Sequence, residues 1–330
     1  MVKTFGKLAD GREARLYTIS CGRIRSEITN YGAALVSLFV DGLDVCLGLD
    51  DVAGYESQGG FLGAVVGRNA NRIGGAKFLL NGQEVVLPAN EGPNNLHSGP
   101  DSWAFRLWDL TAHTENSLPL SLHSPHGDQG FPGNADVSVT YTIENDGLTI
   151  SYKAVSDRDT AFNLTNHAYF NLFGQDKPEK AMDQELMIPG EAFCPDDAAN
   201  IPTGEVRAVE GTPFDFRSFK PIGRDIGMDY EPLHLQGGYD HNFVNCGDIC
   251  AVMRNPESGL TMTVTTDLPG VQLYAGNFLD NNGKGVIYGK RSGVALETQF
   301  FPDSVNHPEW KQPFVQANEV FESTTRYAFT

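Results

Sequence analysis

Four short segments of the chain place a histidine or a carboxylate in a polar, turn-rich or strand-end setting. The side chains that stand out in them are His97, His167, Asp240 and Glu297. A carboxylate with an ordinary pKa of about 4 is ionised at neutral pH, and an imidazole with a pKa of about 6.5 is a usable acid. One glutamate and one histidine can therefore supply a general base and a general acid. Judged singly, such a histidine is more often structural, and a lone glutamate at a strand end is usually solvated.

The sequence lacks the motifs that bind common cofactors. No Gly-x-Gly-x-x-Gly segment follows a strand pattern and opens a helix, and neither a Walker-type phosphate loop nor a His-Glu-x-x-His pair occurs. A Gly-x-Ser-x-Gly nucleophile elbow is also absent. His123 and His126 lie in a Pro/Gly loop where solvation is expected, and Cys246 with Cys250 offers too few ligands for structural zinc. We therefore expect neither a cofactor nor a metal.

The net charge and the cysteine content indicate which classes of partner and which cellular location to expect. The 42 acidic residues against 24 basic ones give a formal net charge of −18. A surface this acidic repels phosphate backbones and anionic lipids, which argues against nucleic acid and membrane partners. No apolar run approaches the roughly 20 residues that cross a bilayer, and no signal-peptide pattern opens the chain. Five cysteines at irregular spacing suit reduced thiols, so we expect a cytoplasmic protein.

Strand patterns dominate the elements that must position these residues. Residues 137–143 and 148–155 alternate apolar and polar side chains on either side of an Asn-Asp-Gly turn, which predicts a β-hairpin. Residues 78–80 and 84–87 flank Asn81-Gly82 as a second hairpin, and residues 33–40 and 260–266 are further strands. Long helical periodicity is absent, and the 36 glycines and 18 prolines punctuate the whole chain. One large all-β sandwich domain over residues 1–330 is the economical prediction, and two β domains also fit.

Six motifs follow one another along the chain. They are Gly67-Arg68-Asn69-Ala70-Asn71-Arg72-Ile73, Asn94-Asn95-Leu96-His97, the run from Leu164 to Leu172 around His167, Tyr239-Asp240-His241-Asn242-Phe243, the run from Gly270 to Leu279, and Leu296-Glu297-Thr298-Gln299 with Pro302-Asp303-Ser304. In this order they resemble the motifs of the aldose 1-epimerase family, and the loop Gly130-Phe131-Pro132-Gly133 is also similar to a loop of that family. The matches extend from about Gly67 to Ser304, which is most of the chain. The resemblance implies a large β-sandwich of the galactose-mutarotase type, in agreement with the strand patterns.

The resemblance also implies an activity, the interconversion of the α and β anomers of a free hexose. Opening the cyclic hemiacetal needs a base for the anomeric hydroxyl and an acid for the ring oxygen, and closing it reverses the two roles. By resemblance, Glu297 is the base, His167 the acid, and His97 a second histidine at the ring oxygen. The implied substrate-binding residues are Asn71, Arg72, Asp240 and Gln272. His241 is expected to be structural, and Tyr169 either to stack on the sugar or to fill the core.

Two other functions remain open at this point. A hexose-6-phosphate 1-epimerase of the same superfamily would need additional cations for the phosphate, and Arg68, Lys77 or Arg291 could fold toward the pocket. A non-catalytic sugar-binding module would not need an acid and a base that converge on the anomeric carbon. We expect a small sugar as the partner and a monomer or homodimer, and the sequence does not rank galactose against glucose.

Overall fold

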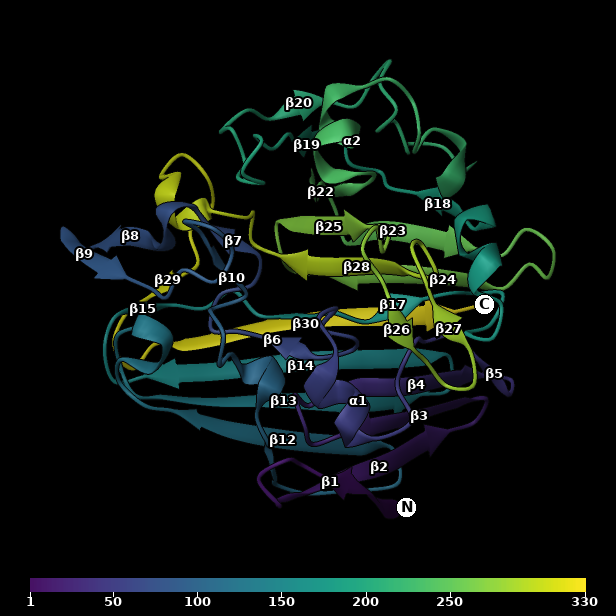
Figure 1. The fold of residues 1–330 in the computed structure, drawn as a ribbon, viewed down its shortest axis with the longest axis horizontal. Coiled ribbons are helices and arrows are strands. Elements are labelled where there is room, and N and C mark those ends of the chain that lie inside the picture. Colours follow the sequence, from purple (N-terminus) through teal and green to yellow (C-terminus); the bar gives the residue numbers. More distant parts are fainter.

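The computed structural model describes all 330 residues, and strands make up most of its regular structure (Figure 1). Only two short α-helices occur, α1 (Val52–Ser57) and α2 (Glu231–Gln236). Short 3₁₀ segments lie at Gly74–Ala76, Trp103–Phe105, Asp128–Gly130, Pro178–Asp183, Ile222–Arg224 and Ser304–Asn306. No helix is long and apolar enough to span a membrane. The predicted all-β class is confirmed.

The largest sheet has nine antiparallel strands in the order β11-β12-β13-β14-β30-β24-β23-β18-β21. Their bounds are β11 (Asp109–Leu110), β12 (Ser117–Ser124), β13 (Ala135–Glu144), β14 (Gly147–Ser156), β30 (Val320–Phe329), β24 (Thr261–Thr266), β23 (Ile249–Arg254), β18 (Glu185–Met187) and β21 (Lys220–Pro221). The C-terminal strand β30 pairs with both β14 and β24, so the end of the chain joins the two halves of this sheet.

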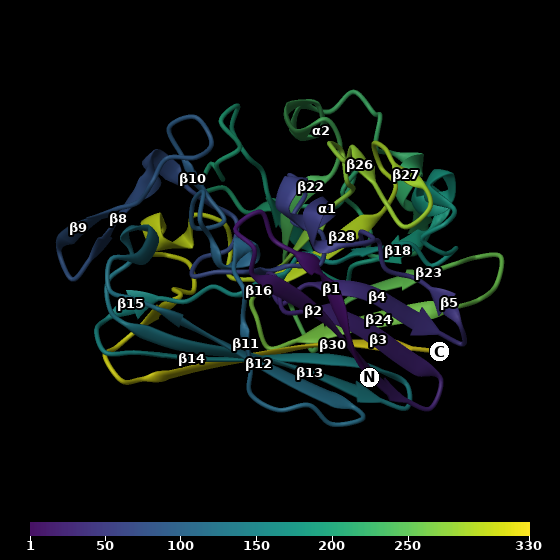
Figure 2. The ribbon, with the colours of Figure 1, turned by 60° about the horizontal axis from the view of Figure 1, so that its bottom comes forward.

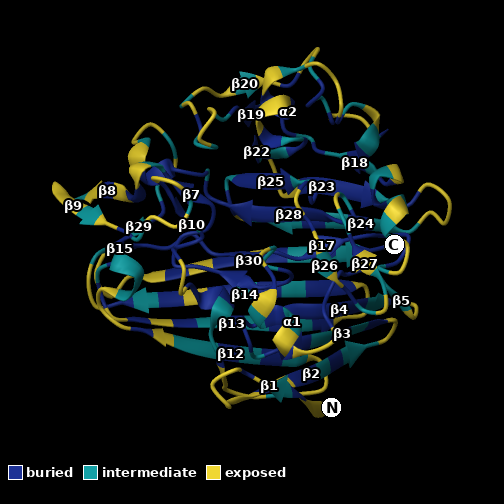
Figure 3. Cartoon of the chain, in the orientation of Figure 1, coloured by how far each residue is buried: buried dark blue, intermediate teal, exposed yellow.

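A second sheet has six strands in the order β17-β28-β25-β22-β19-β20. Its members are β17 (Tyr169–Phe170), β28 (Val294–Gln299), β25 (Gly270–Tyr274), β22 (Asp240–Val244), β19 (Ala192–Cys194) and β20 (Arg207–Ala208). Every residue of β28 is buried, and β25 and β28 are almost entirely dark blue in Figure 3. A polar side chain on these two strands is therefore held in a shielded environment.

The N-terminal strands form a five-stranded sheet of β1 (Val2–Lys7), β2 (Glu13–Cys21), β3 (Ile24–Thr29), β4 (Leu35–Val40) and β5 (Leu43–Asp44). Strands β2 and β3 lie against β12 and β13, as Figure 2 shows. Five two-stranded ladders complete the fold: β10 (Asn95–Leu96) with β7 (Arg72–Ile73), β15 (Thr160–Ala161) with β29 (Phe314–Val315), β16 (Thr165–Asn166) with β6 (Val65–Val66), β26 (Asn281–Asn282) with β27 (Ile287–Tyr288), and β8 (Lys77–Leu80) with β9 (Gln83–Val86).

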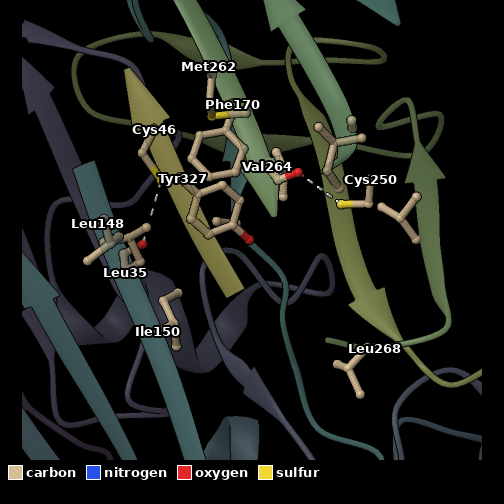
Figure 4. Packing of buried hydrophobic residues seen from close by; sticks show 14 of the residues in the cluster. Leu35, Cys46, Leu148, Ile150, Phe170, Cys250, Met262, Val264, Leu268 and Tyr327 are labelled. Carbon is tan, nitrogen blue, oxygen red and sulfur yellow. Dashed lines mark hydrogen bonds between the residues drawn. The ribbon is translucent and has the colours of Figure 1, made fainter. Parts of the chain in front are cut away.

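One apolar cluster of 56 buried residues unites the two large sheets, with members that run from Tyr17 to Phe329. Phe170 of the six-stranded sheet packs on Tyr327 of β30, with ring centroids 5.0 Å apart (Figure 4). Leu148 and Val264 of the nine-stranded sheet belong to the same cluster. This face-to-face packing is the predicted β-sandwich.

The strands predicted from alternation are present with small shifts. The hairpin of β13 and β14 turns at Asn145 and Asp146, and that of β8 and β9 turns at Asn81-Gly82. Both residues of the second turn have positive φ, 52° and 75°, which suits an Asn-Gly hairpin turn. Strand β4 starts at Leu35 rather than at Ala33, because Ala33 has a left-handed φ of 46°. All five cysteines are free thiols, as expected.

Candidate active site

Side chains of three neighbouring strands gather on one face of the six-stranded sheet. Register pairs Gln272 with Glu297 and Tyr274 with Asp240. Because side chains alternate between faces, these four share the face opposite to the buried Leu273. The alternation around Glu297 and Gln272 thus directs Leu296, Val271 and Leu273 into the core and the two polar side chains to the opposite face.

The small ladder of β7 and β10 contributes a second group of polar residues. The backbone N–H of Asn71 donates to Nδ1 of His97 at 3.0 Å, and the N–H of His97 donates to the Asn71 carbonyl. An Nδ1 atom that accepts a hydrogen bond leaves the proton of neutral imidazole on Nε2. His97 therefore presents an Nε2–H donor. Asn71 and His97 both have positive φ, 59° and 50°, and the ladder holds them in this uncommon conformation.

His167 follows β16 and lies between the two groups. Its main chain is fixed by bonds from its own N–H to Ala64 and from the Gly63 N–H to its carbonyl. Its Nε2 lies 3.5 Å from Oε1 of Glu297, and its ring centroid lies 5.6 Å from that of His97. His97, His167 and Glu297 are each at most 5% exposed.

These groups line one cavity of about 220 Å³. Pockets for drug-sized ligands measure roughly 300–1,000 Å³, so this cavity fits a smaller molecule. Its walls are polar and aromatic, formed by Gly59, Gly60, Phe61, Asn71, Arg72, Glu91, Leu96, His97, His167, Tyr169, Asn200, Asp240, Tyr274, Phe278 and Glu297.

Arg72 is the only lysine or arginine that lines the cavity. Its Nε and Nη2 donate to the two carboxylate oxygens of Glu91 at 2.5 and 2.8 Å, a bidentate pair. Arg72 is therefore not a surface ion pair, because its side chain is only 10% exposed. Asp240 also lines the cavity, and Nε2 of Gln272 donates to its Oδ1 at 2.8 Å.

Burial shifts the ionisation of the acid–base groups away from the ordinary values assumed from the sequence. Burial raises the pKa of Glu297 well above its usual value, Asp240 raises it further, and Arg72 opposes both effects. Burial also raises the pKa of Asp240. In the opposite direction, burial lowers the pKa of His167 to about 4 and that of His97 well below its usual value. The same desolvation thus makes the carboxylate a stronger base and the imidazolium a stronger acid.

The structure brings six of the seven predicted site residues to the cavity wall: Asn71, Arg72, His97, His167, Asp240 and Glu297. Gln272 does not line the cavity and instead supports Asp240 from behind. His241 points to the other face of β22, where it packs on Phe214 with ring centroids 4.7 Å apart. Tyr169 lines the cavity and donates from its hydroxyl to the Gly60 carbonyl at 2.9 Å.

Sequence reasoning missed several wall residues. Phe61 lies edge-on to His97, with ring centroids 4.6 Å apart, and Phe278 is 74% exposed at the rim. Tyr274 alternates in phase with Gln272 on β25, so the period-two pattern could have identified it. Glu91 and Asn200 lie in turns, and nothing in their local sequence indicates that they approach Arg72 or the cavity.

His97, His167 and Glu297 also offer three donor atoms within 4.8 Å of one another. A metal-bound histidine normally donates its other ring N–H to a carboxylate, a carbonyl or water. Nδ1 of His97 instead accepts from the Asn71 amide, and Nδ1 of His167 is buried without a partner. This outer hydrogen-bonding arrangement does not fit a metal ligand set, and it fits proton transfer.

Comparison with known proteins agrees with this site. The family model described as aldose 1-epimerase matches residues 15–328. The chain is 39% identical over 326 residues to the galactose mutarotase of Bos taurus, covering 95% of this chain and 93% of that protein. It is also 39% identical over 319 residues to the aldose 1-epimerase of Haemophilus influenzae, covering 92% of this chain and 91% of that protein.

Solved structures give the same result. The galactose 1-epimerase of Lactobacillus acidophilus superposes with a TM-score of 0.89 at 27% identity, covering 100% of this chain and 98% of that one. An aldose epimerase homologue from C. elegans superposes with a TM-score of 0.88 at 28% identity, covering 96% of this chain and 98% of that one. This protein belongs to the aldose 1-epimerase family of isomerases.

Proposed function

We propose that this isomerase interconverts the α and β anomers of free hexoses such as galactose and glucose, with Glu297 as base and His167 as acid. The observation that carries these roles is the pair itself, a carboxylate and an imidazole 3.5 Å apart on the wall of a sugar-sized cavity.

In the ring-opening direction, Glu297 takes the proton of the anomeric hydroxyl as the bond between the anomeric carbon and the ring oxygen breaks. The imidazolium of His167, a minor form at neutral pH because burial lowers the pKa of this group to about 4, gives its proton to the ring oxygen, which yields the open-chain aldehyde. After rotation about the adjacent carbon–carbon bond, His167 takes this proton back while Glu297 returns the other to the carbonyl oxygen. No atom is gained or lost, so the reaction needs no co-reactant.

Other wall residues hold the sugar in this proposal. The Nε2–H of His97 is a donor for the ring oxygen or a neighbouring hydroxyl, and Asp240 accepts from hydroxyl groups. Gln272 acts indirectly, because its amide fixes one oxygen of Asp240. Phe61, Tyr169 and Tyr274 supply aromatic surface for the apolar face of the ring.

A free hexose is favoured over its 6-phosphate. The one lining cation, Arg72, is already paired with Glu91. Arg68 is 1% exposed and donates to main-chain carbonyls of Pro132 and Gly133, and Lys77 pairs with Glu84 on the exposed hairpin. Arg291 donates to the Gly237 carbonyl and does not line the cavity. A dianionic phosphate therefore lacks a free partner.

Polarimetry of freshly dissolved α-galactose and α-glucose, with anomer exchange followed by NMR for glucose 6-phosphate, tests this assignment. We expect rapid decay of optical rotation for the free sugars and a much lower kcat/KM for the phosphate. A higher kcat/KM for the phosphate would favour the hexose-6-phosphate epimerase, and sugar binding without anomer exchange would favour a binding module.

We also propose a domain organisation, a class of partner and a location for this protein. Residues 1–330 act as one sandwich domain, in agreement with the core cluster that runs from Tyr17 to Phe329. The partner is a small sugar rather than nucleic acid or a membrane, the protein is a monomer or homodimer, and its free thiols suit a cytoplasmic location.

A further inference from the structure

The site is assembled from two separate parts of the fold, and their alignment needs an explanation. The six-stranded sheet carries Glu297 and Asp240, whereas the ladder of β7 and β10 carries Arg72 and His97. Beyond Glu297 the chain leaves β28 and passes beside β7, where it forms the turn Pro302-Asp303-Ser304 (Figure 1). This turn matches a family motif but contributes no residue to the cavity wall.

Asp303 clamps the main chain on both sides of Ile73, immediately after Arg72. Its N–H donates to the Arg72 carbonyl at 2.9 Å, and its Oδ1 accepts from the Gly74 N–H at 2.9 Å. Strand β10 occupies the other edge of the same segment, where Leu96 pairs with Arg72. The segment that bears the only cation of the site is thus held along both edges.

The position of Asp303 is costly to maintain by itself. The residue is 5% exposed, its φ of 57° is left-handed, and burial raises the pKa of its carboxyl. Asn306 donates to Oδ1 at 2.7 Å, and Nε2 of His307 lies 3.7 Å from Oδ2. A Cβ atom on Gly74 would come within 3.2 Å of Oδ2, so glycine permits this close approach.

We infer that Asp303 is a positioning residue for the reaction, which acts by fixing Arg72 relative to Glu297. It does not touch the sugar. Its carboxylate and main-chain N–H connect the end of the base-bearing strand to the cation-bearing segment, and Glu91 then fixes the guanidinium of Arg72 at the cavity wall. This inference rests on the proposed function, because it assumes that Arg72 serves the sugar reaction.

Substitutions at Asp303 separate positioning from folding. Asp303→Gly removes the carboxylate but suits the left-handed backbone, so the Gly74 N–H loses its acceptor without added strain. Asp303→Asn keeps an Oδ1 acceptor and tolerates the same φ. We expect kcat/KM to fall by roughly 10- to 100-fold in the glycine variant, since misplacement by about 1 Å can cost 100-fold. The asparagine variant should stay within about threefold of the wild type.

Asp157→Ala is the matched control. Asp157 also accepts a main-chain N–H, from Asn134 at 2.8 Å, but it lies on an exposed turn outside the cavity wall. This variant should lose some stability and keep its kcat/KM. If Asp303→Gly is not recovered folded, Gly74→Ala replaces it, because the added Cβ would meet Oδ2 of Asp303 at 3.2 Å and displace the carboxylate while the left-handed backbone of Asp303 is unchanged.

A double-mutant cycle with Arg72→Met gives the decisive comparison. If Asp303 acts through Arg72, deleting its carboxylate should change kcat/KM by less than about twofold once Arg72 is gone. Fully multiplicative losses, or no loss in Asp303→Gly alone, would overturn the positioning role while the proposed function stands. No loss in Arg72→Met alone would overturn both this inference and the expectation that Arg72 is a substrate-binding residue.

Discussion

The buried imidazole of His167 predicts a specific dependence of stability on pH. Its pKa in the folded protein is about 4, against an ordinary value of about 6.5. The unfolded chain therefore binds more protons than the folded one between these values. The stabilisation that comes from keeping His167 neutral is complete above pH 6.5 and is lost as the pH falls toward 4.

The size of this effect follows from the two pKa values. At pH 5.5 an unfolded histidine is about ten to one protonated, whereas the folded His167 remains almost neutral. The free energy of unfolding should therefore fall by about 1.4 kcal/mol per such histidine between pH 7.5 and 5.5. His167→Gln should remove this amount from the pH dependence, whatever it does to stability at neutral pH.

The measurement is denaturant unfolding at the two pH values, with His167→Gln made in a Glu297→Gln background. In that background the neighbouring carboxylate is absent, so its own protonation does not contribute to the pH dependence of the free energy of unfolding. His123→Gln is the control, because the His123 side chain is 60% exposed. If His167→Gln and its parent lost the same free energy on acidification, the imidazole would not be held neutral by burial, and the reasoning on acid strength would fail with it.

Three further predictions concern catalysis. Glu297→Gln should lower kcat by roughly 100-fold or more, measured by polarimetry, while the fold is retained. Glu322→Gln, on the exposed face of β30, is the control and should leave kcat unchanged. His167→Asn should lower kcat rather than raise KM, and a change in KM alone would make His167 a binding residue. Dialysis against a chelator should leave activity unchanged, because the histidine hydrogen bonds do not fit metal ligation; activity restored by one metal would contradict this.

Much of the sheet structure could be predicted because alternation is a local signal. Residues 137–155 specify their own hairpin, and the Asn81-Gly82 turn specifies another. The ladder of β7 and β10 could not be predicted, because strands of two residues carry no periodicity. Their pairing depends on contacts made elsewhere, such as the bond from Asp303 to Arg72.

In the candidate site, too, some residues could be identified from local sequence and others depend on tertiary contacts. The residues implied by the family motifs reach one cavity, except that Gln272 lies behind Asp240. Glu91 was missed, although it forms the shortest ion pair there. The turn that carries Glu91 has no periodic pattern, and its approach to Arg72 is a tertiary contact. Expectations for ionisation were also wrong, since ordinary pKa values hold only in water and both reacting groups are buried.

Burial explains why one strand register can create a reactive pair. The apolar neighbours of Glu297 on β28, Leu296 and Val294, belong to the core, so the strand cannot slip by one residue without burying the carboxylate in the sandwich and exposing leucine to the cavity. The core therefore fixes the side on which Glu297 emerges, and the chain crossing at Ala64 and Gly63 fixes His167 opposite to it. The desolvation that raises the basicity of one group and the acidity of the other comes from the same packing, so the stability of the fold and the reactivity of the pair cannot be varied independently at these positions.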